Sequence, residues 1–364
     1  MKTITTITTK KKMDSLQAVR AFAFLGVYLT HCEVVPNMGG WGVSVFILLS
    51  GFLMTVSYFD RIDHMRISWR DNFYFAVKKI KRLYPLHLTM DFFFILMTFV
   101  GVFFGATSLS ATKLLLKCVL HATLTQTFVP IKEYYYSLNG LSWYLSVSLF
   151  LYFAFPWILS GIKKNSNQKC IWNSFLAWLI IAVFVACSEL YFADNDNLFV
   201  YLNYVCPVLR LFDFFIGCNF GILFIRNKGR LTETRANVLE GITILLIVLQ
   251  IWFLNSEHTT IVTRILGHST FLYAPTSIAL VYLFAESKGI FSKLLTNRLT
   301  IYLGDISPYG YLIHVQVILY LNYFFQYFCG INVNKYLTAV IVTIVTFVAI
   351  QMYLWIEKKL AKGR

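Results

Sequence analysis

Charged residues are scarce in this sequence. Asp, Glu, Lys and Arg make up 13% of its 364 residues, whereas 58% are hydrophobic and 18% are aromatic. A soluble domain carries about one quarter charged residues. The shortage excludes an ordinary soluble globular protein. It predicts an all-α, polytopic membrane protein in which nearly the whole length crosses the bilayer.

Several common signatures are also missing. The 7 cysteines lie in or beside apolar segments without a Cys-x-x-Cys or other paired spacing, so we expect free thiols and predict no disulfide. No Gly-x-Gly-x-x-Gly, P-loop or zinc motif is present, and we expect no metal site. No small-residue cleavage site follows the first apolar stretch. We therefore interpret that stretch as a retained helix and not as a signal peptide.

Ten apolar stretches are each long enough to cross a bilayer as a helix. They cover residues 16–35, 40–59, 84–106, 139–160, 170–191, 198–225, 236–254, 265–285, 299–328 and 335–356. Pro207 is expected to kink the sixth stretch, and residues 108–128 are expected on the membrane surface. Residues 1–364 are therefore expected to form one transmembrane domain, with residues 1–13 as a short cytoplasmic tail.

Acidic residues are the scarcer charges, with 17 against 32 basic residues and a net charge of +15. The ten predicted spans place 25 of the 32 Lys and Arg residues on one side of the membrane and five on the other. Because cytoplasmic loops carry the excess of Lys and Arg, both termini are predicted to be cytoplasmic and His31 to lie near the outer face. Membrane orientation thus explains the charge, and no nucleic-acid partner is predicted.

A polar pair interrupts the first predicted span. Arg20 and His31 are almost three helical turns apart in an otherwise apolar segment, so their side chains share one face at a separation of about 16 Å. A charge within hydrocarbon costs about 2.5–3.5 kcal/mol on insertion scales, so it normally faces protein or a water-filled cavity. The pair therefore predicts a polar path through the bundle.

Two further segments each have a structural and a functional interpretation. Gly42, Ser50 and Gly51 in the second span can serve close helix packing, which is the favoured interpretation of these residues alone. The basic run at residues 78–82 lies next to the membrane. It either marks the cytoplasmic side or binds a polyanionic ligand.

Three more groups of polar or aromatic residues lie within predicted spans. Trp143 in the fourth span can be an interfacial anchor. Arg210 and Asp213, three residues apart in the sixth, are expected to form a structural ion pair. Tyr309, Tyr311 and His314 form a polar cluster near the inner start of the ninth span, where the histidine can also be only a hydrogen-bonded structural residue.

Taken in order, these segments resemble the membrane-bound acyltransferase family 3, the bacterial integral-membrane O-acyltransferases that modify cell-surface glycans. The strongest element is Arg20-x10-His31, followed by Gly42-Val43 and by residues 46–52. Lys79-x-x-Arg82 is similar to the family's Arg-x-x-Arg motif. Further similarities to its Trp-Ser-Leu block and its Tyr-Leu-x-His motif are Trp143-Tyr144-Leu145-Ser146 and Tyr311-Leu312-Ile313-His314.

Two positions depart from the family pattern. Gln17 stands where many members carry Asp, and Ser148 stands where many carry Glu, which leaves the role of a second carboxylate open. Some relatives also carry a fused extracytoplasmic hydrolase-like domain, which we do not expect in these 364 residues. Transfer to the acceptor would then occur in the membrane domain or on a separate extracytoplasmic partner protein.

The resemblance implies an O-acetyltransferase of the bacterial cytoplasmic membrane. It would move an acetyl group from cytoplasmic acetyl-CoA to a hydroxyl of a capsule, O-antigen or exopolysaccharide, or of a precursor, so the expected partners are acetyl-CoA, the glycan acceptor and the lipid bilayer. His31 would act as base or acyl carrier, and Arg20 would stabilise phosphates or an oxyanion. Lys79 and Arg82 would bind the phosphates of coenzyme A. The remaining residues expected to line the substrate site are Ser50, Trp143, Ser148, Tyr311 and His314.

Other functions are compatible with ten spans. A transporter or flippase of a glycan precursor explains the spans and the intramembrane charges, but not the ordered motifs, and no inverted repeat of broken helices is visible. A non-catalytic scaffold leaves the alignment of Arg20 with His31 without a role. The acyl group could also be another short one, such as succinyl.

Overall fold

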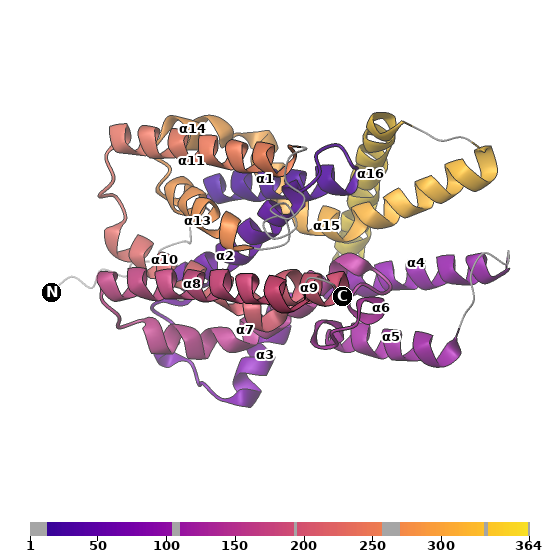
Figure 1. Ribbon diagram of the computed structural model, residues 1–364, viewed down its shortest axis with the longest axis horizontal. Coiled ribbons are helices and arrows are strands. Elements are labelled where there is room, and N and C mark those ends of the chain that lie inside the picture. Colours follow the sequence, from indigo (N-terminus) through magenta and orange to yellow (C-terminus); the bar gives the residue numbers. More distant parts are fainter. Residues whose placement is uncertain (1–12, 104–109, 193–194, 257–269, 331–333, 363–364) are drawn as a thin grey trace.

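The computed structural model describes residues 13–103, 110–192, 195–256, 270–330 and 334–362, and every regular element in these ranges is a helix (Figure 1). The predicted all-α, polytopic membrane bundle is confirmed. Residues 1–12 of the predicted cytoplasmic tail lie outside the described ranges.

Each of the ten predicted spans overlaps a described helix, and residues 104–106 of the third span and 265–269 of the eighth lie outside the described ranges. These helices are α1 (Asp14–His31), α2 (Met38–Tyr58), α4 (Tyr84–Phe103), α7 (Trp143–Ile162), α8 (Asn167–Phe192), α10 (Pro207–Asn227), α11 (Glu233–Leu254), α13 (Thr270–Glu286), α15 (Arg298–Phe324) and α16 (Lys335–Lys362). The shorter elements between them are η1 (Ile62–His64), α3 (Trp69–Ile80), α5 (Ala111–Thr123), η2 (Gln126–Phe128), α6 (Lys132–Tyr135), η3 (Gly140–Ser142), α9 (Asp196–Val200), η4 (Tyr201–Val205), α14 (Ile290–Leu295) and η5 (Phe325–Cys329).

Among the described helices, 7 are long and apolar enough to cross a membrane: α2, α4, α7 with η3, α8, α9 through α10, α11 and α16. Helix α13 is apolar but shorter. Helices α1 and α15 carry the more polar sequences, and both lie against other helices of the bundle: α1 packs on α2 and α15, and α15 packs on α16. Polar residues are tolerated on these two helices because neighbouring protein covers them.

The sixth span is interrupted at the predicted position. A π-helical turn ends at Val205, Cys206 leaves the helical conformation with ψ 118°, and α10 begins at Pro207. Proline suits this first position because its missing N–H would have no helical partner there. The carbonyl oxygen of Tyr204 in this turn accepts a 2.7 Å hydrogen bond from Nε of Arg210. The interruption is therefore stabilised by a buried side chain of the helix that follows.

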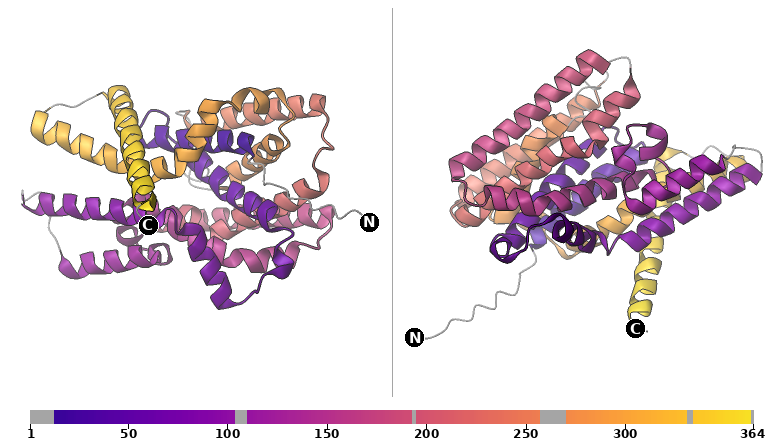
Figure 2. Two further views of the ribbon diagram at one scale, coloured as in Figure 1. Left: turned by 180° about the vertical axis from the view of Figure 1, so that it is seen from behind. Right: turned by 90° about the horizontal axis from the view of Figure 1, so that it is seen from below.

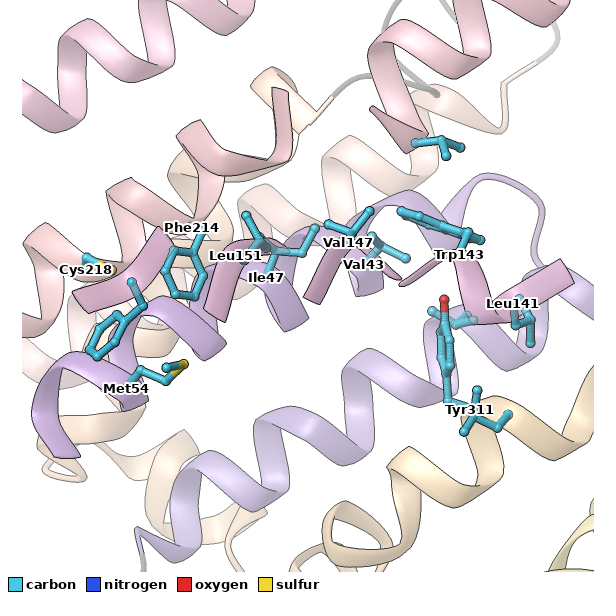
Figure 3. Packing of buried hydrophobic residues seen from close by; sticks show 14 of the residues in the cluster. Val43, Ile47, Met54, Leu141, Trp143, Val147, Leu151, Phe214, Cys218 and Tyr311 are labelled. Carbon is cyan, nitrogen blue, oxygen red and sulfur yellow. The ribbon is translucent and has the colours of Figure 1, made fainter. Parts of the chain in front are cut away.

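Small residues allow the central helices to cross closely. A Cβ atom on Gly51 would lie 2.2 Å from the carbonyl oxygen of Phe214, which marks the crossing of α2 and α10. A Cβ atom on Gly304 would lie 2.0 Å from the carbonyl oxygen of Gln17, which marks the crossing of α1 and α15. The packing interpretation of Gly51 is thus confirmed. Figure 3 shows the apolar side chains of α2, α7 and α10 that fill the space around the first crossing.

The loops predicted on the cytoplasmic side contact one another. Lys163, after α7, forms an ion pair with Asp63 in η1, and this pair holds the pKa of the Asp63 carboxyl below its usual range. Nη2 of Arg226, in α10, donates to the carbonyl oxygen of Lys163 at 2.7 Å. Nζ of Lys288, after α13, donates to the carbonyl oxygen of Gly229 at 2.7 Å. The loops that the charge bias groups together therefore lie at one end of the bundle.

The loops predicted on the outer side form a second set of contacts. Nδ2 of Asn37, before α2, donates to the carbonyl oxygen of Leu254 at 3.0 Å, and the Tyr273 hydroxyl donates to the carbonyl oxygen of Asn37 at 3.0 Å. Helices α4 and α5 lie side by side and project at the same end of the bundle as the C-terminal part of α15 (Figures 1 and 2). Helices α1 and α2 lie in the middle of the bundle in these views.

Candidate active site

An outer cavity of about 490 Å³ lies at the end of α1 where His31 is found. Its wall includes His31, Asn37, Tyr136, Trp143, Tyr204 and Tyr311. Asn37 and Tyr136 belong to the outer set of loops. The His31 side chain is exposed, so its imidazole is accessible to a molecule entering this cavity.

A second histidine determines which nitrogen of His31 carries a proton. Nδ1 of the fully buried His314 lies 2.8 Å from the carbonyl oxygen of Gly310, and its Nε2 lies 3.0 Å from Nδ1 of His31. A carbonyl oxygen only accepts hydrogen bonds, so the hydrogen-bond network assigns the proton of neutral His314 to Nδ1. Its Nε2 then accepts from Nδ1–H of His31. This arrangement leaves Nε2 of a neutral His31 with a free lone pair.

An inner cavity of about 170 Å³ holds Arg20. Nη1 of Arg20 donates to Oε1 of Gln17 at 3.2 Å, and Gln17 is the neutral residue that replaces the family's common Asp. The guanidinium charge is therefore not cancelled from within α1. Asp305 on α15 is a carboxylate that interacts electrostatically with Arg20. Further residues that line this cavity are Phe46, Ser50, Lys79, Tyr144, Ser148 and Tyr152.

Tyr311 lines both cavities. Its ring centroid lies 5.4 Å from that of Tyr144 and 6.2 Å from that of Phe46. In Figure 3 the Tyr311 side chain extends from α15 toward Trp143. The path predicted between Arg20 and His31 thus includes two cavities that share Tyr311 in their walls.

The predicted site residues fall into three groups. Arg20, Ser50, Lys79, Ser148 and Tyr311 line the inner cavity, and His31, Trp143 and Tyr311 line the outer one. His314 lies behind His31. Arg82 is separate from these groups, because its guanidinium lies 5.3 Å from the centroid of the Tyr309 ring and Arg82 lines neither cavity. The two cations of the Lys79-x-x-Arg82 motif thus have different surroundings.

Sequence reasoning missed several residues of the two cavities. Tyr204 lines the outer cavity from the turn before α10, and Tyr152 lines the inner one from α7. The whole chain has 22 tyrosines, so a tyrosine in an apolar span does not by itself indicate a site. Asp305 had a usable signal, because a carboxylate in a predicted span indicates an interior partner.

The predicted ion pair in α10 is confirmed and supports the wall of the outer cavity. Nη1 of Arg210 lies 3.1 Å from Oδ2 of Asp213, and both side chains are fully buried. The Arg210 guanidinium also lies 4.9 Å from the centroid of the Tyr204 ring. A cation over an aromatic face is attracted to it, so the ion pair helps to hold Tyr204 in the wall.

The site thus combines a helical membrane bundle with an accessible histidine and a cation on the same helix. The chain belongs to acyltransferase family 3, whose acyltransferase domain matches residues 13–355. It is thus a multi-pass integral membrane protein.

The similar curated proteins are distant. The chain is 24% identical to the acyltransferase MdmB of Streptomyces mycarofaciens over 227 residues. This alignment covers 57% of this chain and 56% of that protein. It is 19% identical to the O-acetyltransferase OatA of Staphylococcus aureus over 359 residues. This alignment covers 96% of this chain and 57% of that protein. The chain thus spans little more than half the length of these relatives. No solved structure matches it.

Proposed function

We propose that this protein is an O-acetyltransferase of the bacterial cytoplasmic membrane, with both termini in the cytoplasm. It moves an acetyl group from cytoplasmic acetyl-CoA to a hydroxyl of a cell-surface polysaccharide or its precursor. The observation that carries this proposal is the pair of cavities that meet at Tyr311, one with Arg20 and Lys79 and the other with an accessible His31.

The inner side suits a donor that carries phosphates. Lys79 lines the inner cavity and also a neighbouring cavity of about 460 Å³, whose wall includes Arg66, Lys78 and Tyr74. Clustered Lys and Arg favour phosphate and pyrophosphate groups. The nucleotide part of coenzyme A would bind in the neighbouring cavity, and its pantetheine arm would extend past Lys79 toward Arg20.

The chemistry requires one base and one group that stabilises negative charge. Nε2 of His31 accepts the proton of the acceptor hydroxyl, and the oxygen of this hydroxyl attacks the thioester carbonyl. Tyr311 lines both cavities and can stabilise the oxyanion, whereas Arg20, about 16 Å from His31 along α1, would hold the donor in the inner cavity. The C–S bond then breaks, and the thiolate takes the proton from His31 and leaves as coenzyme A. Tyr311 lines both cavities, so we expect its ring to move when the thioester meets the acceptor.

Purified protein and acetyl-CoA labelled in the acetyl group test the proposal. In vesicles that also contain a surface-polysaccharide precursor, we expect coenzyme A release together with acid-stable, alkali-labile label in the glycan. A transporter or flippase would leave acetyl-CoA intact, which would overturn the proposal. Parallel reactions with succinyl-CoA identify the acyl group. Mass spectrometry of glycan from cells that lack the protein should then show loss of the same O-acyl group.

Lys79→Ala is expected to raise the Michaelis constant for acetyl-CoA by about tenfold, which corresponds to about 1.4 kcal/mol of donor binding. Arg82→Ala is the matched control. Its guanidinium lies over Tyr309 and lines neither cavity, so we expect a change of less than about threefold. Initial rates at saturating acceptor measure both constants. Unchanged Michaelis constants in both variants would show that this basic loop marks membrane orientation and does not bind the donor.

Arg20→Lys retains the charge in the inner cavity but removes the planar guanidinium, whose N–H groups form a fork of hydrogen-bond donors. We expect kcat/KM to fall by about 100-fold, because the planar fork that would hold the donor in this cavity is lost. Arg235→Lys, at an exposed position of α11, is the control and should retain wild-type activity. An Arg20→Lys variant with wild-type kcat/KM would show that a point charge is sufficient at this position.

A further inference from the structure

Helix α3 lies at the edge of the bundle, where it packs on α7 (Figure 1). Its 12 residues extend over about 18 Å, less than the roughly 30 Å of hydrocarbon in a bilayer. It is not among the described helices that are long and apolar enough to cross a membrane. Phe75, Ala76 and Ile80 are buried and hold one side of α3 on the bundle. The other side is exposed.

Large apolar side chains form a line along the exposed side of α3. Trp69, Phe73 and Val77 follow one another at intervals of four residues, which places them on one side of the helix, and they are 74%, 55% and 42% exposed. The Trp69 ring centroid lies 5.0 Å from that of Trp157 in the candidate span α7. Trp157 lies about 7.5 Å before the end of α7 at Ile162. A helix in the membrane interface buries its apolar side by about 5–10 Å, so the line lies at an interfacial depth.

Basic side chains border this apolar line. Arg70 and Lys81 are exposed and fall within about 40° of Val77 on the helix surface. Neither residue lines the inner cavity, the outer cavity or the neighbouring cavity beside Lys79, so both lie outside the site proposed for the donor. Residues 66–82 contain six Lys and Arg residues and one acidic residue, Asp71. An apolar side bordered by cations is complementary to an anionic lipid surface.

We propose that α3 lies in the membrane interface and binds anionic phospholipids of the leaflet on the side of the basic loops. Trp69, Phe73 and Val77 insert between the acyl chains, and Arg70 and Lys81 contact the headgroup phosphates. One basic residue near an anionic surface contributes about 1 kcal/mol, which corresponds to about a fivefold preference over a zwitterionic lipid. This inference does not depend on acyl transfer.

Fluorescence quenching of the full chain in nanodiscs tests the proposal. The discs contain equal amounts of phosphatidylglycerol and phosphatidylcholine, and either lipid carries bromine near the headgroup end of its acyl chains. The emission of Trp69 is the difference between the wild type and Trp69→Phe. We expect this emission to be quenched by both lipids, with about a fivefold preference for phosphatidylglycerol. Phe73→Trp adds a second probe on the same side and covers the case in which Trp69→Phe does not fold.

Two double variants test the role of the basic residues. Arg70→Gln with Lys81→Gln should make the quenching by the two lipids equal. Lys169→Gln with Arg235→Gln is the matched control, because it removes the same charge from exposed positions outside α3, and it should retain the preference. Absence of quenching by either lipid would show that protein, such as a second copy of the chain, covers α3. Equal quenching in the wild type would show that the headgroup charge is not recognised. Either result would overturn the proposal.

Discussion

His31→Ala is expected to lower kcat for acyl transfer by about 10²–10⁴-fold, the contribution of a positioned general base. The fold should be retained, because His31 is exposed at the last position of α1 and its loss opens no internal cavity. Purified variant and wild-type protein are compared by coenzyme A release at saturating substrates. Their gel-filtration profiles serve as the control for folding. If His31→Ala retained the wild-type kcat, His31 would not be the general base.

His314 provides a paired test of the proton assignment. In His314→Gln, the amide can donate to the Gly310 carbonyl and accept from Nδ1–H of His31, so we expect a loss of less than about tenfold. His314→Leu removes both hydrogen bonds and should lose most of the activity that His31→Ala loses. The acid limb of the pH–rate profile, where protonation of the base removes activity, should be retained in the Gln variant. Equal activities of the two variants would show that His314 does not orient His31.

Asp213→Asn is expected to lower the free energy of unfolding by about 3–5 kcal/mol, because the fully buried Arg210 would lose its charged partner. For a chain of this size the expected fall in melting temperature is roughly 10 °C. Thermal unfolding in detergent, monitored by circular dichroism, measures it. The outer cavity should also be affected, since Arg210 packs on Tyr204 of its wall.

Two controls separate the buried charge from a general effect of mutation. Asp63→Asn breaks the exposed ion pair with Lys163 and should leave the melting temperature unchanged, because an exposed pair contributes little. The double replacement Arg210→Met with Asp213→Leu removes both charges and should recover most of the loss. An Asp213→Asn variant as stable as wild type would show that the pair is dispensable.

Part of the candidate site could be predicted from the sequence because its signals are local. Arg20 and His31 lie on one helix, where a spacing of eleven residues determines a shared face. Pro207 marked the interruption of the sixth span for a similar reason, since its ring restricts the backbone wherever it occurs. Gln17 could not be interpreted from its position alone. The structure shows that it is hydrogen-bonded to Arg20.

The sequence by itself determined the apolar spans, the grouping of the loops by charge and the helix that carries Arg20 and His31. These depend on hydropathy, charge and helical periodicity, which act over a few neighbouring residues. Only the tertiary structure decided that two cavities share Tyr311, that His314 lies against His31, and that Lys79 and Arg82 have different surroundings. These contacts join residues from distant parts of the chain. They depend on how closely α1, α2, α10 and α15 cross, which backbone contacts at Gly51 and Gly304 determine.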